Sequence, residues 1–162
     1  MSILGNSKTL YINLIIIFSI FILDRLTKLY VIYLEKINSS PEIFSSKFLS
    51  IYLIWNEGIA FGLFSFNEQF YYNIITLIII IITFVILFFA IKSAGVEKIG
   101  FSMIFGGSLG NIFDRLYYAA VVDFIDFHIN NIHWFIFNIA DIFISLGVII
   151  LITIEFFGRK KI

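Results

Sequence analysis

A long apolar run from Asn138 to Phe157 most constrains how this chain can fold. About 20 apolar residues are enough for a helix to cross a lipid bilayer. The run begins with Asn138 and Asp141, which lie three residues apart and therefore share one face of a helix. Because a carboxylate inside a membrane span is costly, the pattern indicates that Asp141 has a function.

The composition places the whole chain in a membrane. Hydrophobic residues make up 60% of the 162 residues, and the mean hydropathy is +1.03, which is far above the range of soluble domains. The formal net charge is zero, and the basic residues form no stripe with aromatics, so nucleic-acid binding is not expected. The absence of cysteine excludes disulfides and thiol nucleophiles. A zinc site at His128 and His133 would need carboxylates from elsewhere, so no metal or other cofactor is expected.

Four apolar stretches predict an all-α membrane protein, a bundle of four transmembrane helices in a single membrane domain over residues 1–162. The predicted spans cover about residues 10–34, 70–91, 99–116 and 138–157, and the outer loops cover about 35–69 and 117–137. Phe48–Trp55 is rich in β-branched and aromatic residues, which predicts a small β-rich extracytoplasmic element between the first two spans. The first span contains Asp24 and Lys28, at the spacing of a helical ion pair.

Small residues recur at every fourth position of the third span, at Ser102, Gly106 and Gly110. Such spacing lets helix backbones approach closely in lipid, so this helix is expected at the centre of the bundle.

The basic residues of the short connections predict the orientation. With four spans they share one side, which should be cytoplasmic together with both termini: Lys8, Lys92, Lys98, Arg159, Lys160 and Lys161. Lys36 and Lys47 in the first outer loop weaken this bias without reversing it. The polar residues that remain then gather at the outer face: Asp24, Asn56, Asn111, Asp114, Arg115, Asp123, Asn138 and Asp141.

Two acids at the ends of different helices suit a catalytic dyad, because close carboxylates titrate apart and can act as base and acid. Asp141 is the first candidate for a member of the dyad. The alternative is that Asp141 is a buried structural acid paired with Arg115. The partner must come from the other acids near the outer face: Asp24, Asp114, Asp123 and Asp126.

Local charge distinguishes these candidates. Asp114 lies next to Arg115, and Asp24 lies one turn from Lys28, so either could be held as a structural ion. Asp123 has no such cation beside it and is flanked by apolar residues, which favours it without excluding the others. Asp126 is most simply a solvated loop residue.

The remaining polar residues each have a simpler interpretation that involves no substrate. Asn56, Asn111 and Asn138 could bind an extended substrate backbone, although for any one of them the simpler interpretation is that it satisfies loop carbonyls. Glu57 is expected to be a solvated loop acid.

Taken together, these residues resemble the lipoprotein signal peptidase family, also called signal peptidase II, which consists of aspartic proteases of the bacterial cytoplasmic membrane. The matching blocks occur in the family's order and cover essentially the whole chain: Asp24–Lys28, Asn56–Phe61, Gly106–Arg115, Val121–Phe124 and Phe137–Asp141. Each block alone is a weak signal, whereas the ordered set is highly specific.

The resemblance implies that Asp123 and Asp141 are the catalytic pair at the outer face of the membrane. It also implies a set of residues that line or support the site: Asp24, Lys28, Asn56, Gly58, Asn111, Arg115, Asn138 and Ala140. The implied substrate is a prolipoprotein whose cysteine carries diacylglycerol, cut just before that cysteine, and the implied inhibitor is globomycin. Ile142 departs from the small residue expected after the catalytic acid, which bears on packing behind Asp141.

Two further expectations follow. Gly58, Ala60 and Gly62 would let the outer loop pass close over a lipidated substrate, in the manner of a lid. The chain is expected to act as a monomer in contact with membrane lipid. The main alternatives are a dimeric proton-coupled exporter, which would place its acid near the midplane, and a lipid-binding scaffold, which would tolerate Asp-to-Asn changes.

Overall fold

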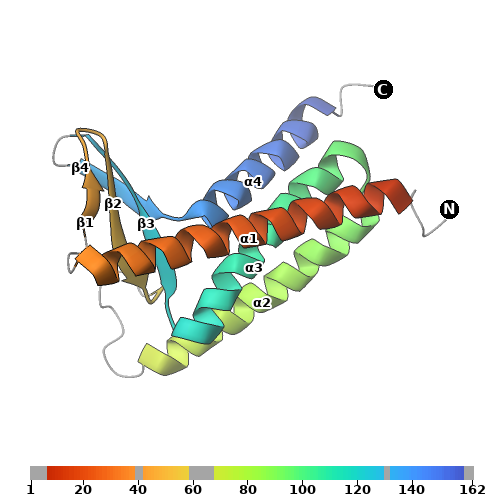
Figure 1. Cartoon of the computed structure of the whole chain (residues 1–162). Helices are drawn as coiled ribbons and strands as arrows, with labels where there is room; N and C mark the ends of the chain where they lie inside the picture. Colours follow the sequence, from red (N-terminus) through yellow and green to blue (C-terminus); the bar gives the residue numbers. More distant parts are fainter. Residues whose placement is uncertain (1–6, 39–41, 59–67, 130–131, 159–162) are drawn as a thin grey trace.

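The chain folds into helices and one antiparallel sheet (Figure 1). The computed structural model describes residues 7–38, 42–58, 68–129 and 132–158. Within them are four helices, α1 (Ser7–Asn38), α2 (Glu68–Lys92), α3 (Gly95–Tyr118) and α4 (Ile139–Gly158). The four strands are β1 (Glu42–Ser45), β2 (Leu49–Asn56), β3 (Val121–Ile129) and β4 (Ile132–Phe137).

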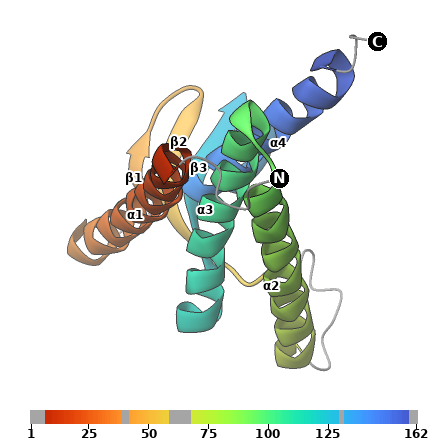
Figure 2. The ribbon, with the colours of Figure 1, turned by 90° about the vertical axis from the view of Figure 1, so that its right-hand side faces the viewer.

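Helix α3 is the centre of the bundle, as its small residues predicted, and it packs against each of the other helices (Figure 2). A Cβ atom at Gly106 would lie 3.0 Å from the carbonyl oxygen of Ile17 on α1. The hydroxyl of Ser102 donates a hydrogen bond of 3.1 Å to Oδ1 of Asn13, also on α1. The absence of larger side chains therefore lets the two backbones approach closely.

The sheet lies at one end of the bundle, with the strands in the order β1-β2-β3-β4 (Figure 1). The last turns of α1 pack on it, and a small core forms where Val31 contacts Val122 and Phe124. The sequence placed the β-rich element between the first two helices alone, and Phe48–Trp55 does form most of β2. However, β3 and β4 come from the segment expected to be the second outer loop, so half of the sheet was missed.

Two of the described helices are long and apolar enough to cross a membrane, over Gln69–Lys92 and Ile139–Phe157. The expected spans at 10–34 and 99–116 form helices α1 and α3, which carry internal charges. The start of α1 and the end of α4 both lie at the end of the bundle away from the sheet (Figure 1).

The charges of α1 and α3 neutralise one another inside the bundle. Nζ of Lys28 lies 3.0 Å from Oδ2 of Asp24, so the predicted helical ion pair is confirmed. Nζ of Lys28 also lies 2.8 Å from Oδ2 of Asp114, and Arg25 bridges the same two acids. Asp114 is thus held by cations of α1, rather than by the adjacent Arg115 as expected.

Candidate active site

The first turn of α4 fixes the position of Asp141. Asn138 is the residue before the helix, and its Oδ1 accepts a hydrogen bond of 3.1 Å from the backbone N–H of Asp141. In return, Oδ2 of Asp141 accepts one of 3.1 Å from the backbone N–H of Asn138. This reciprocal cap satisfies donors that a helix start otherwise leaves free. The carboxylate therefore has a defined direction at the head of the helix.

Asp123 reaches the same place from the sheet. It lies on β3 opposite Ile54, beside an irregularity in the pairing with β2, and is only 3% exposed. Its Oδ1 accepts a hydrogen bond of 2.7 Å from the side-chain amide of Asn138. Its Oδ2 accepts one of 2.8 Å from the amide of Asn56, at the end of β2. Asn138 therefore donates to both carboxylates, to Asp123 through its side-chain amide and to Asp141 through its backbone N–H.

Burial raises the pKa of Asp123 to about 6. The amides of Asn56 and Asn138 oppose this shift by donating to the ionised form, whereas the neighbouring charge of Asp141 adds to it. A carboxyl group with a pKa near 6 can both give and take a proton close to neutral pH.

A cavity of about 230 Å³ connects the two acids. Its polar wall comes from both helices and sheet: Asn56, Ser108, Asn111, Arg115, Asp123 and Asp141. Apolar side chains, including Ile79 of α2 and Ile144 of α4, complete it. Two carboxylates facing one partly apolar cavity can activate a water molecule and protonate a bound carbonyl group.

Asn111 on α3 connects the carboxylate of Asp141 to the buried ammonium group of Lys28. Its Nδ2 donates a hydrogen bond of 2.8 Å to Oδ1 of Asp141, and its Oδ1 accepts one of 2.9 Å from Lys28. Because the ammonium group can only donate, it fixes the orientation of the Asn111 amide. Lys28 thus orients the Asn111 amide, and that amide donates to the Asp141 carboxylate.

Arg115 forms another side of the cavity. Its guanidinium carbon lies 5.2 Å from the centre of the Tyr72 ring, and a Cβ atom at Gly58 would lie 2.9 Å from Nη2. Gly58 also has a φ of 74°, which favours glycine, and its N–H donates 2.8 Å to Oδ1 of Asn56. Among the described residues, Nη1 of Arg115 is buried and has no hydrogen-bond partner. It remains a donor for a bound ligand.

Asp24 supports the site from behind. Its Oδ1 accepts a hydrogen bond of 3.1 Å from the backbone N–H of Ala140, in the first turn of α4. Both residues are fully buried. The predicted residues Asp24 and Ala140 therefore hold the start of α4 rather than line the cavity.

The structure brings the predicted site residues into one connected group, with some corrections. Asn56, Asn111 and Asn138 do not satisfy loop carbonyls with their side-chain amides, because those amides bond the acids. Asp141 bonds Asn111 and the backbone of Asn138, not Arg115 as in the structural alternative. Glu57 is exposed as expected, and Ile142 is half-buried. Ala60 and Gly62 lie outside the described residues.

Reasoning from local sequence gave one wrong prediction, for Asp126, and overlooked one residue of the cavity, Ser108. Asp126 is fully buried, not solvated, and its Oδ2 lies 2.7 Å from Nδ1 of His133. Ser108 lines the cavity and was not considered. Its position three residues before Asn111 could have identified it, because residues three apart share a helix face.

Comparison with known proteins gives one consistent result. A sequence model of the family described as signal peptidase (SPase) II matches residues 16–157. The chain is 48% identical over 157 residues to a lipoprotein signal peptidase of Pelagibacter ubique, covering 96% of this chain and 95% of that one. It is 45% identical over 145 residues to a lipoprotein signal peptidase of Wigglesworthia glossinidia brevipalpis, covering 86% and 90%.

The fold also resembles that of solved structures. A solved structure described as a bacterial membrane enzyme superposes with a TM-score of 0.70 at 32% identity, covering 93% of this chain and 92% of that one. The match thus extends over sequence and architecture alike, and over nearly the full length of each relative. This chain is a bacterial membrane protein and belongs to the signal peptidase II family, whose members are aspartic-type hydrolases.

Proposed function

We propose that this protein removes the signal peptide from diacylglyceryl-modified prolipoproteins, cutting just before the lipidated cysteine, with Asp123 and Asp141 as the catalytic dyad. The observation that carries the proposal is that both acids face one cavity and share Asn138 as a hydrogen-bond donor. The match to lipoprotein signal peptidases supplies the substrate class.

The reaction proceeds by direct hydrolysis. The ionised carboxylate of the dyad takes a proton from water, and the water oxygen bonds to the scissile carbonyl carbon. The protonated partner gives its proton to the carbonyl oxygen. The tetrahedral intermediate collapses as the C–N bond breaks, and the leaving amine receives the proton that the base had taken. One hydroxyl group of the intermediate returns a proton to the partner, which restores the dyad. No residue becomes covalently attached.

The surrounding donors would hold the substrate backbone. Arg115 offers a buried N–H that no described residue accepts, at the wall of the cavity. A carbonyl group of the extended substrate is a suitable acceptor. Asn56 and Asn111 fix the two acids, while Asp24, Lys28, Gly58 and Ala140 support these residues from behind. Globomycin-type inhibitors would occupy the same cavity.

The proposed membrane arrangement has four spans in one domain over residues 1–162, with the sheet and the site at the outer face. Both termini then lie in the cytoplasm. The charges of α1 and α3 are buried against one another, whereas the lipid-side positions of these helices are apolar, for example Leu14, Phe18 and Leu116. This explains how helices with internal charges can still cross a bilayer. We infer that the protein acts as a monomer in contact with membrane lipid.

A gel-shift cleavage assay tests the proposal. The purified protein is incubated with a diacylglyceryl-modified prolipoprotein and with the same precursor lacking lipid. We expect cleavage of the lipidated precursor only, and loss of cleavage in Asp141→Asn. Glu57→Gln is the matched control, because Glu57 is an exposed acid next to Asn56 and should retain activity. A folded, monodisperse protein that leaves the lipidated precursor uncut would refute the assignment.

A further inference from the structure

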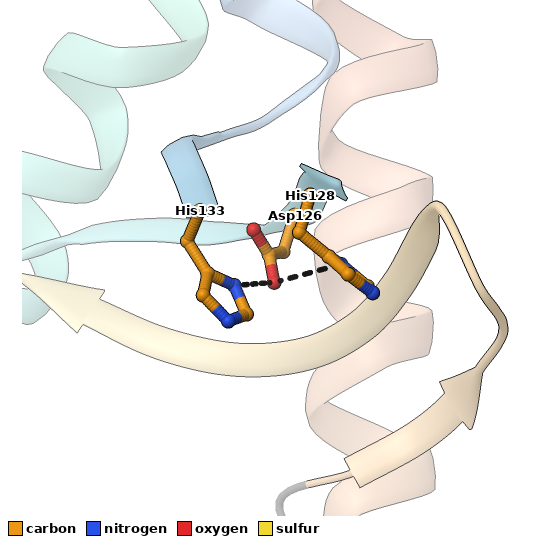
Figure 3. Close-up of side chains that lie close together, drawn as sticks. All are labelled: Asp126, His128 and His133. Carbon is orange, nitrogen blue, oxygen red and sulfur yellow. Dashed lines mark hydrogen bonds and ion pairs between the residues drawn. The ribbon is translucent and has the colours of Figure 1, made fainter. Parts of the chain in front are cut away.

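Three potential metal ligands gather at the hairpin formed by β3 and β4 (Figure 3). Asp126 and His128 lie on β3, and His133 lies on β4 directly opposite His128. One ligand atom from each residue lies within 4.8 Å of the others. The cavity wall that the described residues form around Asp123 and Asp141 includes none of the three. The cluster is therefore separate from the candidate active site.

The carboxylate of Asp126 lies between the two imidazole rings (Figure 3). Its Oδ2 is 2.7 Å from Nδ1 of His133 and 3.4 Å from Nδ1 of His128. Asp126 is fully buried, and its Oδ1 has no hydrogen-bond partner among the residues described. Burial, and then the nearby Asp126 carboxylate, raise the pKa of Tyr52 on β2, so this hydroxyl also lies close to the cluster. A buried carboxylate oxygen without a donor is unfavourable unless another charge compensates it.

The second ring nitrogen of His128 determines what Nδ1 can do. Nε2 lies 3.2 Å from the backbone carbonyl oxygen of Ser46. Because a carbonyl only accepts, Nε2 must carry the proton, which leaves Nδ1 of the neutral ring with a lone pair. That lone pair faces Oδ2 of Asp126, and Nδ1 is buried without a hydrogen bond among the described residues. Two electron-rich atoms that face each other create a place for a cation.

We propose that Asp126, His128 and His133 form a binding site for a divalent transition-metal ion of the zinc class. Two imidazole nitrogens and one carboxylate oxygen are a donor set that zinc accepts, with water in a fourth position. From the sequence, a zinc site at the two histidines was expected to need carboxylates from elsewhere and Asp126 was interpreted as a solvated loop residue, whereas the fold places Asp126 between them. The hydrogen bond from His128 to Ser46 is the outer contact that orients a metal-bound imidazole.

The three ligand atoms, which lie within 4.8 Å of one another, would have to draw together around an ion. Zinc–ligand bonds of about 2 Å in a tetrahedron place ligand atoms about 3.3 Å apart, close to the 3.4 Å between His128 Nδ1 and Asp126 Oδ2. The 2.7 Å between His133 Nδ1 and the same oxygen is shorter. His133 can move because its side chain is 56% exposed. On binding, the proton on its Nδ1 is transferred to Nε2, so that Nδ1 presents a lone pair to the metal.

A bound ion would link three segments of the sheet: β3, β4 and the connection between β1 and β2. It would cross-link β3 to β4 close to the paired residues Ile129 and Ile132 and, through Ser46, hold the connection between β1 and β2. The same strand β3 carries Asp123 three residues before Asp126. Metal binding is therefore expected to stabilise the sheet without taking part in hydrolysis.

Zinc binding to the tag-free, full-length protein in detergent tests the proposal, with a chromophoric chelator as competitor. We expect one equivalent to bind, and we expect zinc to raise the thermal unfolding temperature. His133→Gln should weaken binding at least tenfold and abolish the temperature shift. Because the His133 side chain is largely exposed, this variant should fold. Co²⁺ as a second probe should give the intense absorption of a tetrahedral site, lost in His128→Gln.

Asp123→Asn is the matched control, since it changes an acid of the same strand that faces the other site. It should bind zinc like the parent protein, whereas Asp126→Asn should not. If the parent protein does not compete with the chelator, or if His133→Gln and His128→Gln bind zinc unchanged, the proposal is wrong. The cluster is then only an ion pair between imidazolium and carboxylate. Peptide cleavage, measured separately, does not depend on this outcome.

Discussion

At the scale of single residues, the carboxyl group of Asp123 sets how the site should respond to pH. Burial holds its pKa at about 6, against the hydrogen bonds from Asn56 and Asn138. Those two amides favour the ionised carboxylate, because an amide N–H donates better to a charged oxygen than to a neutral carboxyl group. Removing either donor should therefore raise the pKa further.

Asn56→Ala should move the pH profile of cleavage upward. The parent protein should show a limb of kcat/KM near pH 6, which reports the titration of Asp123 within the coupled dyad. Loss of the Asn56 amide removes a contact of 2.8 Å to Oδ2 and should shift that limb by roughly half a unit or more toward higher pH. Steady-state rates across a series of buffers provide the measurement.

Glu57→Gln controls for a change of charge or polarity in the same loop and should leave the limb in place. A limb that stays unchanged in Asn56→Ala, or moves to lower pH, would show that Asn56 does not stabilise the ionised carboxylate.

Residue-scale prediction from sequence succeeded where partners are close along the chain and failed where they are distant. The Asp24–Lys28 pair lies within one helix turn, and the structure contains it. Asp126 is bonded by His133 across a strand pair, so its burial depends on pairing that no local pattern revealed. The three asparagines were each expected to satisfy loop carbonyls, but the fold places each beside a carboxylate.

At the scale of elements, buried charges fix α1 against α3. Asp114 accepts from both Arg25 and Lys28 and is itself fully buried. It also accepts a hydrogen bond of 3.2 Å from the backbone N–H of Val122, at the start of β3. One carboxylate thus joins two helices and the strand that carries Asp123.

Asp114→Asn should destabilise the protein strongly. The change leaves two buried cations with Asp24 as their one remaining acid, and an uncompensated buried charge costs about 3 to 5 kcal/mol. We expect the unfolding temperature in detergent to fall by roughly 10 °C. Glu97→Gln alters an exposed acid of the same helix and should change it little. Equal stability of the two variants would contradict the role assigned to Asp114.

Gly110→Ala should also loosen the contact of α3 with α1. The added methyl group would overlap the carboxylate of Asp24, which must then move away from Lys28 or from the backbone of Ala140. Overpacking of this kind costs about 1 to 3 kcal/mol. Thermal unfolding should show the loss, while Ser19→Ala, on an exposed part of α1, should match the parent. An undisturbed unfolding temperature in Gly110→Ala would mean that the helices are not held this closely.

The elements themselves were predicted unevenly. All four helices follow from long apolar stretches, because helix formation is local and lipid favours it. Strand β2 was found from its β-branched and aromatic residues, but β3 and β4 were interpreted as a loop. Their alternation of polar and aromatic residues becomes part of the sheet because β3 pairs with β2, about 70 residues earlier in the chain, and β4 then pairs with β3.

At the scale of the whole molecule, the sheet marks one end of the bundle and the helix ends near both termini mark the other (Figure 1). With the proposed four spans, Lys47 should lie on the outer side of the membrane and Ala94 on the cytoplasmic side. The sequence contains no cysteine, so single cysteines report position without background.

Lys47→Cys should react with a membrane-impermeant maleimide in intact spheroplasts, whereas Ala94→Cys should react only in inverted vesicles or after permeabilisation. Both positions are exposed, so a difference in labelling reflects the side of the membrane. Labelling of both cysteines from one side would refute the four-span arrangement. The positive-inside pattern of the basic residues is the sequence signal for this topology.

The most direct test of the central claim is single-turnover cleavage of the lipidated precursor by Asp123→Asn and Asp141→Asn, each compared with the parent and with Glu57→Gln. General acid–base groups contribute about 100-fold to 10,000-fold to a rate. The dyad predicts that each of the two variants loses at least about 100-fold while still binding the precursor, and that Glu57→Gln retains the parent rate. Cleavage near the parent rate by either aspartate variant would contradict the dyad.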